Sequence, residues 1–89
     1  MVLVKRIILD VLKPHNPNSL EFTKALAEQG TGYQVKITVI EVDEMTETVV
    51  IVIEGSDIQY DKIAETITSL GGSIHSIDEV EVINDTNNP

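Results

Sequence analysis

The stretch that decides the fold lies in the middle of the chain, at residues 35–54, and has the sequence VKITVIEVDEMTETVVIVIE. Its two halves, residues 35–43 and 48–54, are dense in β-branched residues, which favour strands. The polar segment between them, Glu44-Met45-Thr46-Glu47, suits a hairpin loop of about four residues. The stretch is therefore predicted to form a β-hairpin.

A helix is predicted on each side of this hairpin. The first, over residues 18–29, begins at Asn18, which precedes a glutamate by three residues as in a capping box. The second, over residues 58–70, has apolar residues at helical spacing and follows Ser56 and Asp57, the two candidate N-caps. Glycines follow both segments and are expected to end the helices.

Two further strands, at residues 2–12 and 74–82, are predicted from their alternation of apolar and polar residues. The order strand, helix, strand, strand, helix, strand is that of the ferredoxin-like βαββαβ fold, of class α+β. We expect an antiparallel sheet in the order 4-1-3-2 with both helices on one face. Residues 1–83 are predicted to form a single domain, and residues 84–89 a flexible C-terminal tail.

Composition excludes several classes of function. The 89 residues carry a net charge of -9 and contain no cysteine, which rules out disulfides and thiolate metal sites. The six basic residues are scattered, which argues against nucleic-acid binding. No apolar run is long enough to span a membrane, so a cytoplasmic location is expected. Residues 1–40 carry a net charge of +2 and residues 41–89 a net charge of -11, so the negative charge belongs to the second half.

Several segments resemble a known family. They are LDVLKPH at residues 9–15, IEG at residues 53–55 and GGSIHSIDEV at residues 71–80, together with acidic positions of the hairpin. These segments resemble the archaeal family called domain of unknown function 211 (DUF211), and the match covers most of the chain. The resemblance implies a ferredoxin-like fold, an archaeal cytoplasmic setting and oligomerisation. It implies no established activity.

The predicted topology brings acidic and histidine side chains to one end of the sheet, where strand ends and the hairpin meet. Carboxylates and imidazoles could bind a divalent cation there, Ca²⁺ or Mg²⁺ if carboxylates dominate and Zn²⁺ or Ni²⁺ if the histidines converge. The alternative is that the acids are solvated loop residues and that the two histidines are structural. The candidate ligands are Asp10, His15, Glu41, Asp43, Glu44, Glu47 and His75.

The face of the sheet without helices is predicted to be too apolar for water. A contiguous apolar patch on so small a domain is the expected mark of a protein interface, so a homo-oligomer is predicted. The residues assigned to this interface are Val4, Ile8, Leu12, Ile40, Val42, Val50, Val52 and Ile77.

Catalysis is not expected. Ser73, His75 and Ser76 are close in sequence, but neighbouring strand residues point to opposite faces, so the histidine is not expected to activate either hydroxyl. The favoured function is a non-enzymatic, self-associating module that binds a divalent cation or small ligand in a regulatory or structural role. The alternative is a regulatory domain that senses an amino-acid-type effector bound between subunits. A subunit of an enzyme complex is the third possibility.

Overall fold

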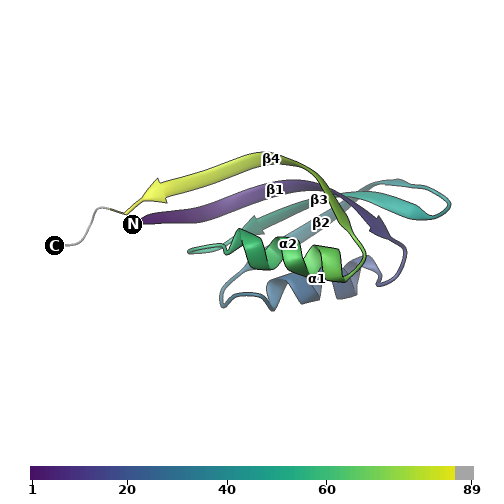
Figure 1. Cartoon of the computed structure of the whole chain (residues 1–89), viewed down its shortest axis with the longest axis horizontal. Coiled ribbons are helices and arrows are strands. Elements are labelled where there is room, and N and C mark those ends of the chain that lie inside the picture. Colours follow the sequence, from purple (N-terminus) through teal and green to yellow (C-terminus); the bar gives the residue numbers. More distant parts are fainter. Residues whose placement is uncertain (86–89) are drawn as a thin grey trace.

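The computed structural model describes residues 1–85 and has the predicted order of elements (Figure 1). The residues 86–89 of the predicted tail lie outside the described residues. The strands and helices are β1 (Val2–Pro14), α1 (Ser19–Ala27), β2 (Gln34–Val42), β3 (Thr46–Glu54), α2 (Tyr60–Ser69) and β4 (Ser73–Asn84). No helix within residues 1–85 is long and apolar enough to cross a membrane.

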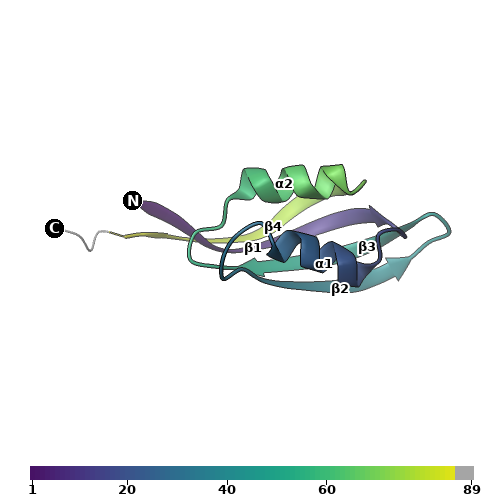
Figure 2. The ribbon, with the colours of Figure 1, turned by 90° about the horizontal axis from the view of Figure 1, so that it is seen from below.

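The four strands form one antiparallel sheet in the order β2-β3-β1-β4, which is the predicted order read from the other edge. Both helices lie on the same side of the sheet (Figures 1 and 2). The ferredoxin-like prediction is confirmed. The opposite side, which no helix covers, is called the helix-free face below.

The helix caps were predicted with mixed success. Asn18 caps α1 as expected, since its side-chain Oδ1 accepts a hydrogen bond from the Glu21 backbone N–H at 2.9 Å. For α2, the predicted caps Ser56 and Asp57 are wrong: the N-cap is Gln59, whose side chain makes no capping hydrogen bond. Its backbone N–H instead donates to the Tyr33 hydroxyl at 2.8 Å.

Two other boundaries differ from the prediction. Glu47, expected in the hairpin loop, belongs to β3, because it pairs with Lys13 of β1. Asn84, assigned to the tail, ends β4 and pairs with Val2. One residue further on, the backbone N–H of Asp85 donates to the Met1 carbonyl at 2.7 Å, so the strand pair extends to the N-terminus.

The hydrophobic core lies between the sheet and the two helices. Apolar residues at alternate positions of β1 and β3 supply the sheet side, and both helices supply residues at helical spacing. The buried cluster consists of Ile7, Leu9, Val11, Phe22, Leu26, Val49, Ile51, Ile53, Ile58, Ile63 and Ile67.

β-Bulges change the face that a strand presents, because one extra residue reverses the alternation of side chains. In β2 a register shift falls between Val39 and Glu41, so Ile40 lies at the irregularity. Beyond it, Glu41 pairs with Thr48 on the helix-free face, and Val42 lies on the helix side. The prediction that Val42 faces away from the helices is therefore wrong.

Register shifts between β1 and β4 overturn two more predicted positions on the helix-free face. Val4 lies next to a shift and packs against the buried core. Ile77 pairs with Leu9, a core residue, so it belongs to the helix side, where it remains 48% exposed. The predicted alternation assumed regular strands, which the bulges interrupt.

The molecule is elongated, with extents of 55 × 22 × 17 Å. The first residues of β1 pair with β4 and not with β3, so these two strands continue beyond the helices as a two-stranded ribbon that carries both described chain ends (Figure 1). The β2–β3 hairpin forms the opposite end of the molecule.

Candidate functional site

The seven predicted cation ligands do not converge on one site. The described residues contain no group of three or more histidine, cysteine, aspartate or glutamate side chains that could hold a metal ion. The ligands divide among a cluster on the helix side, a pair on the helix-free face and exposed acids of the hairpin. Cation binding therefore stays a prediction, without a preformed set of ligands within residues 1–85 of one copy.

The cluster on the helix side, called the clasp below, consists of Lys13, His15 and Glu47. Oε2 of Glu47 lies 2.9 Å from Nδ1 of His15, and Oε1 of Glu47 accepts a hydrogen bond from Nζ of Lys13 at 3.2 Å. Nε2 of His15 lies 3.0 Å from the carbonyl oxygens of Asp43 and of Glu44. The clasp therefore joins the end of β1 to the hairpin loop.

The His15 imidazole faces hydrogen-bond acceptors at both nitrogens, which favours the doubly protonated ring. Its hydrogen bond to Glu47, followed by that to the Glu44 carbonyl, raises the pKa of His15 above the ordinary value of 6.5. The hydrogen bonds from His15 and then from Lys13 lower the pKa of Glu47 below 4.5. With its ring nitrogens engaged in this way, neither nitrogen of His15 is available to a cation in this conformation.

Lys13 has a side chain that is completely buried, which is unusual for a lysine. Its ammonium donates to the Pro14 carbonyl at 2.9 Å and to Glu47, and it lies 5.6 Å from the centroid of the Phe22 ring. A buried ammonium needs such partners, because desolvation strongly disfavours an unpaired charge. The sequence pattern contained a signal for this position: Lys13 continues the alternation of Leu9 and Val11, both core residues.

Asp10 and His75 form the pair on the helix-free face. Nδ1 of His75 lies 3.6 Å from Oδ2 of Asp10, and the imidazole is 77% exposed. Together with Leu12 and Thr48 they line a hollow of about 240 Å³. This pair is the part of the predicted cluster that is both accessible and beside a concave surface.

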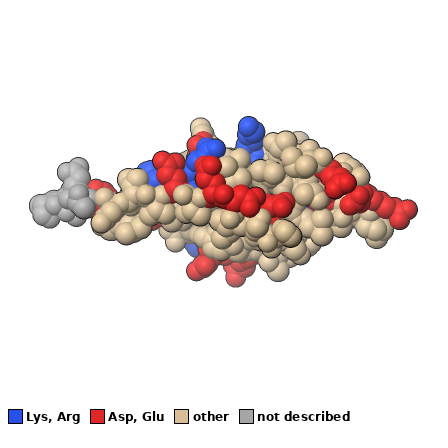
Figure 3. Space-filling model, turned by 90° about the horizontal axis from the view of Figure 1, so that it is seen from above, with Lys and Arg blue, Asp and Glu red and all other residues tan. Residues whose placement is uncertain are grey.

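The three acids of the hairpin, Glu41, Asp43 and Glu44, are exposed. Asp43 and Glu44 contribute backbone carbonyls to the clasp, whereas Glu41 lies on the helix-free face beside Thr48. Figure 3, which views the molecule from the side away from the helices, shows acidic side chains gathered at the hairpin end and in a row across the middle. This arrangement agrees with solvated acids as well as with ion binding.

The helix-free face has an apolar centre. Val50 and Val52 of β3 and Ile8 of β1 are half-buried, and Leu12 is 42% exposed. These four residues are among those predicted to form the interface, and they lie on the helix-free face, as predicted. The face can be described by three cross-strand rows, set by the pairing of β2, β3 and β1: Lys36, Val52 and Ile8 in the first row, Thr38, Val50 and Asp10 in the middle row, and Glu41, Thr48 and Leu12 in the last row.

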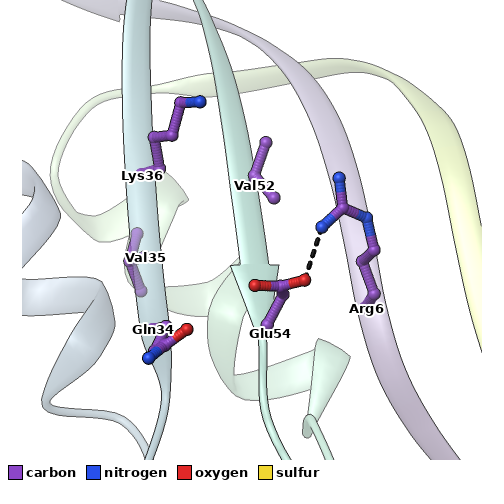
Figure 4. A pocket seen from close by; sticks show the side chains of 6 residues that line it. All are labelled: Arg6, Gln34, Val35, Lys36, Val52 and Glu54. Atoms are coloured by element: carbon purple, nitrogen blue, oxygen red, sulfur yellow. Dashed lines mark hydrogen bonds and ion pairs between the residues drawn. The ribbon is translucent and has the colours of Figure 1, made fainter.

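A second hollow on this face, of about 260 Å³, was not predicted from the sequence. It is lined by Arg6, Gln34, Val35, Lys36, Val52 and Glu54 (Figure 4). Arg6 donates to Glu54 at 2.5 Å and to Glu79 of β4 at 2.7 Å. These hydrogen bonds, first that to Glu79, raise the pKa of the Arg6 guanidinium. The alternation of side chains along β1 and β3 indicates that Arg6 and Glu54 face the same side of the sheet, but only the strand register places Glu54 directly opposite Arg6.

Comparison with known proteins identifies relatives without a described activity. The model of the DUF211 family, described as "Uncharacterized ArCR", matches residues 5–86. A protein of Methanocaldococcus jannaschii, described as "Uncharacterized protein MJ0319", is 48% identical over 77 residues, which cover 86% of this chain and 79% of the relative. The function therefore has to be argued from the surfaces of the molecule.

Proposed function

We propose that this chain, which belongs to the DUF211 family, is a non-enzymatic module that associates with copies of itself through its helix-free face. The observation that carries the proposal is the apolar centre of that face, formed by Ile8, Leu12, Val50 and Val52. An uncovered apolar patch on a domain of 9.8 kDa is a common mark of a protein interface. Burying it would also extend the small core of this chain.

The three rows support a second copy as the partner. Consider two copies packed face to face about a two-fold axis that lies between the two sheets and runs along the middle row, across the strands. The first row of each copy then faces the last row of the other. Ile8 then meets Leu12 of the second copy, and Lys36 meets Glu41 of the second copy. The side chains of Lys36 and Glu41 make no hydrogen bond or ion pair within residues 1–85. Both the apolar pair and the oppositely charged pair are therefore complementary between the two copies.

The middle row sets one condition on this arrangement. It places the Asp10 carboxylates of the two copies near the axis, where like charges repel. Each Asp10 carboxylate also lies 3.6 Å from Nδ1 of the His75 of its own copy, so an imidazole stands beside each carboxylate near the axis.

A binding role is proposed in preference to catalysis on the basis of the hydroxyls near His75. Oγ of Ser76 donates to Asp78 at 2.7 Å, and His75 faces Asp10. The arrangement therefore lacks the hydroxyl-to-imidazole hydrogen bond that activates a nucleophile.

The experiment is light scattering coupled to size exclusion on the wild type and on Leu12→Lys, with Val80→Lys as the matched control. Val80 is more exposed than Leu12, at 54%, and pairs with the core residue Ile7 on the helix side. We expect a multimeric wild type, a monomeric Leu12→Lys and no effect of Val80→Lys. A wild type that is monomeric at every concentration would refute self-association.

A charge exchange tests the arrangement of the two copies. Lys36→Glu alone places like charges opposite each other and is expected to weaken association, and adding Glu41→Lys to the same chain should restore it. Equal dissociation of the single and double variants would show that these residues do not face each other.

A further inference from the structure

The hollow bounded by Arg6, Lys36 and Glu54 has features of a small-molecule site. It lies on the helix-free face, and three strands contribute to its walls. In Figure 4, Glu54 lies between Gln34 and Arg6, and Lys36 lies farther along β2 beside Val52. The hollow measures about 260 Å³ and is open to solvent, so it has room for a small molecule.

The polar groups of the hollow differ in their availability to a ligand. The Arg6 guanidinium already donates to two carboxylates, so its charge is balanced within the chain. The Lys36 ammonium and the Gln34 amide make no hydrogen bond with other described residues, and neither does Oε1 of Glu54. The hollow therefore offers one free cation, one free carboxylate oxygen and one amide.

We propose that this hollow binds a free α-amino acid with a small aliphatic side chain. Lys36 would hold the carboxylate, Oε1 of Glu54 and the Gln34 side-chain oxygen beside it would accept from the ammonium, and Val52 would contact the aliphatic group (Figure 4). A simple anion would leave the free oxygen of Glu54 facing negative charge. A simple cation would meet the uncompensated charge of Lys36. A zwitterion matches both groups, and L-valine, whose small aliphatic side chain suits contact with Val52, is the probe.

The site lies within one chain, so it does not depend on self-association. Lys36 and Val52 are shared, however, because the proposed pairing of faces directs Lys36 toward Glu41 of the second copy and buries Val52. A ligand that occupies Lys36 competes with that contact, so amino acid and second copy should weaken each other's binding by the same factor.

The test is a titration of the uniformly ¹⁵N-labelled full chain with L-valine, followed by amide chemical shifts. We expect saturable shifts centred on Arg6, Gln34, Lys36 and Glu54, with a dissociation constant on the order of 1 mM. The probes isobutylamine, which lacks the carboxylate, and isovalerate, which lacks the ammonium, should each bind at least about tenfold more weakly. The absence of saturable shifts with L-valine would overturn the proposal, as would isovalerate binding as tightly as L-valine.

Two substitutions test which side chains of the hollow bind L-valine. Glu54→Gln and, as a second variant that leaves the Arg6 pair intact, Lys36→Gln should each weaken binding of L-valine at least about tenfold. Glu65→Gln, at an exposed position of α2, is the matched control and should not change it. Unchanged binding to both hollow variants would overturn the proposal.

Leu12→Lys separates the site from self-association, because Leu12 lies two rows away from Lys36. Binding of L-valine should persist in this variant and should be tighter than in an associated wild type. Loss of binding in a folded Leu12→Lys would overturn the ligand site, whatever the mass of the wild type. If the wild type is monomeric and still binds L-valine, only the proposed self-association fails.

Discussion

Replacing Glu47 by glutamine tests the clasp directly. The carboxylate of Glu47 serves two donors, the buried ammonium of Lys13 and the imidazole of His15. Glutamine keeps one acceptor oxygen but turns an amide N–H₂ toward the other donor. Lys13 then has at most a neutral amide oxygen in place of the carboxylate, besides the Pro14 carbonyl and the face of the Phe22 ring, in a site that water does not reach.

The expected cost follows from the burial of the three groups. Removing one partner of a fully buried ion pair costs about 3–5 kcal/mol. Lys13 is fully buried, but the Glu47 side chain is 17% exposed and the His15 side chain 38%, so water screens part of the interaction. We therefore expect Glu47→Gln to lower the free energy of unfolding by about 2 kcal/mol, which is a large part of the stability of a domain of this size.

Urea denaturation followed by circular dichroism measures this cost. With an m-value of roughly 1 kcal/mol/M, the midpoint should fall by about 2 M at fixed protein concentration. The matched control is Glu44→Gln, which removes the same charge from an exposed position in the adjacent loop and should cost less than about 0.5 kcal/mol.

A second variant tests whether the cost of Glu47→Gln comes from the buried ammonium of Lys13. Adding Lys13→Met to Glu47→Gln replaces the buried charge by an apolar chain of similar volume, and the double variant should be more stable than Glu47→Gln alone. If Glu47→Gln costs no more than Glu44→Gln, or if Lys13→Met restores nothing, the reasoning about the clasp is refuted.

Two further predictions concern stability. The raised pKa of His15 stabilises the folded chain fully below pH 6.5, and this stabilisation is lost as the pH rises through the folded-state pKa of His15. The lowered pKa of Glu47 stabilises the folded chain above pH 4.5, and this stabilisation is lost as the pH falls through the folded-state pKa of Glu47. The difference in urea midpoint between wild type and Glu47→Gln should therefore be greatest between pH 4.5 and 6.5, and a difference that is constant with pH would contradict this. Asn18→Ala removes the side-chain cap of α1 and should lower stability by about 1 kcal/mol, as measured by the same urea assay, whereas Asn18→Asp keeps an acceptor oxygen at the cap and should cost little.

The fold could be predicted because local signals agreed with the global pattern. The β-branched halves of the hairpin, the cap at Asn18 and the glycines after the helices each have a local physical cause. The cap of α2 could not be predicted, because the donor of Gln59 is satisfied by Tyr33, a residue 26 positions away. Only the folded chain brings those two groups together.

The candidate site was predicted less well, because its composition depends on strand register. A bulge in β2 exchanges the faces of Glu41 and Val42, and another in β4 moves Ile77 to the helix side. The alternation of a single strand does not reveal such an insertion. His15 and Asp10 were grouped by the ends of their strands, but they lie on opposite sides of the sheet, the first with the buried Lys13 and the second with His75.

The length of the molecule relative to its width has a consequence for its motion in solution. A body of 55 × 22 × 17 Å rotates more slowly about its short axes than about its long axis. The helices and strands lie along the long axis (Figures 1 and 2), so helical N–H bonds point along that axis and the N–H bonds of the sheet point across it. Rotational diffusion of a single copy therefore gives helix and sheet amides different relaxation rates even where the backbone is equally rigid, and association with a second copy alters that difference by changing the shape of the tumbling body.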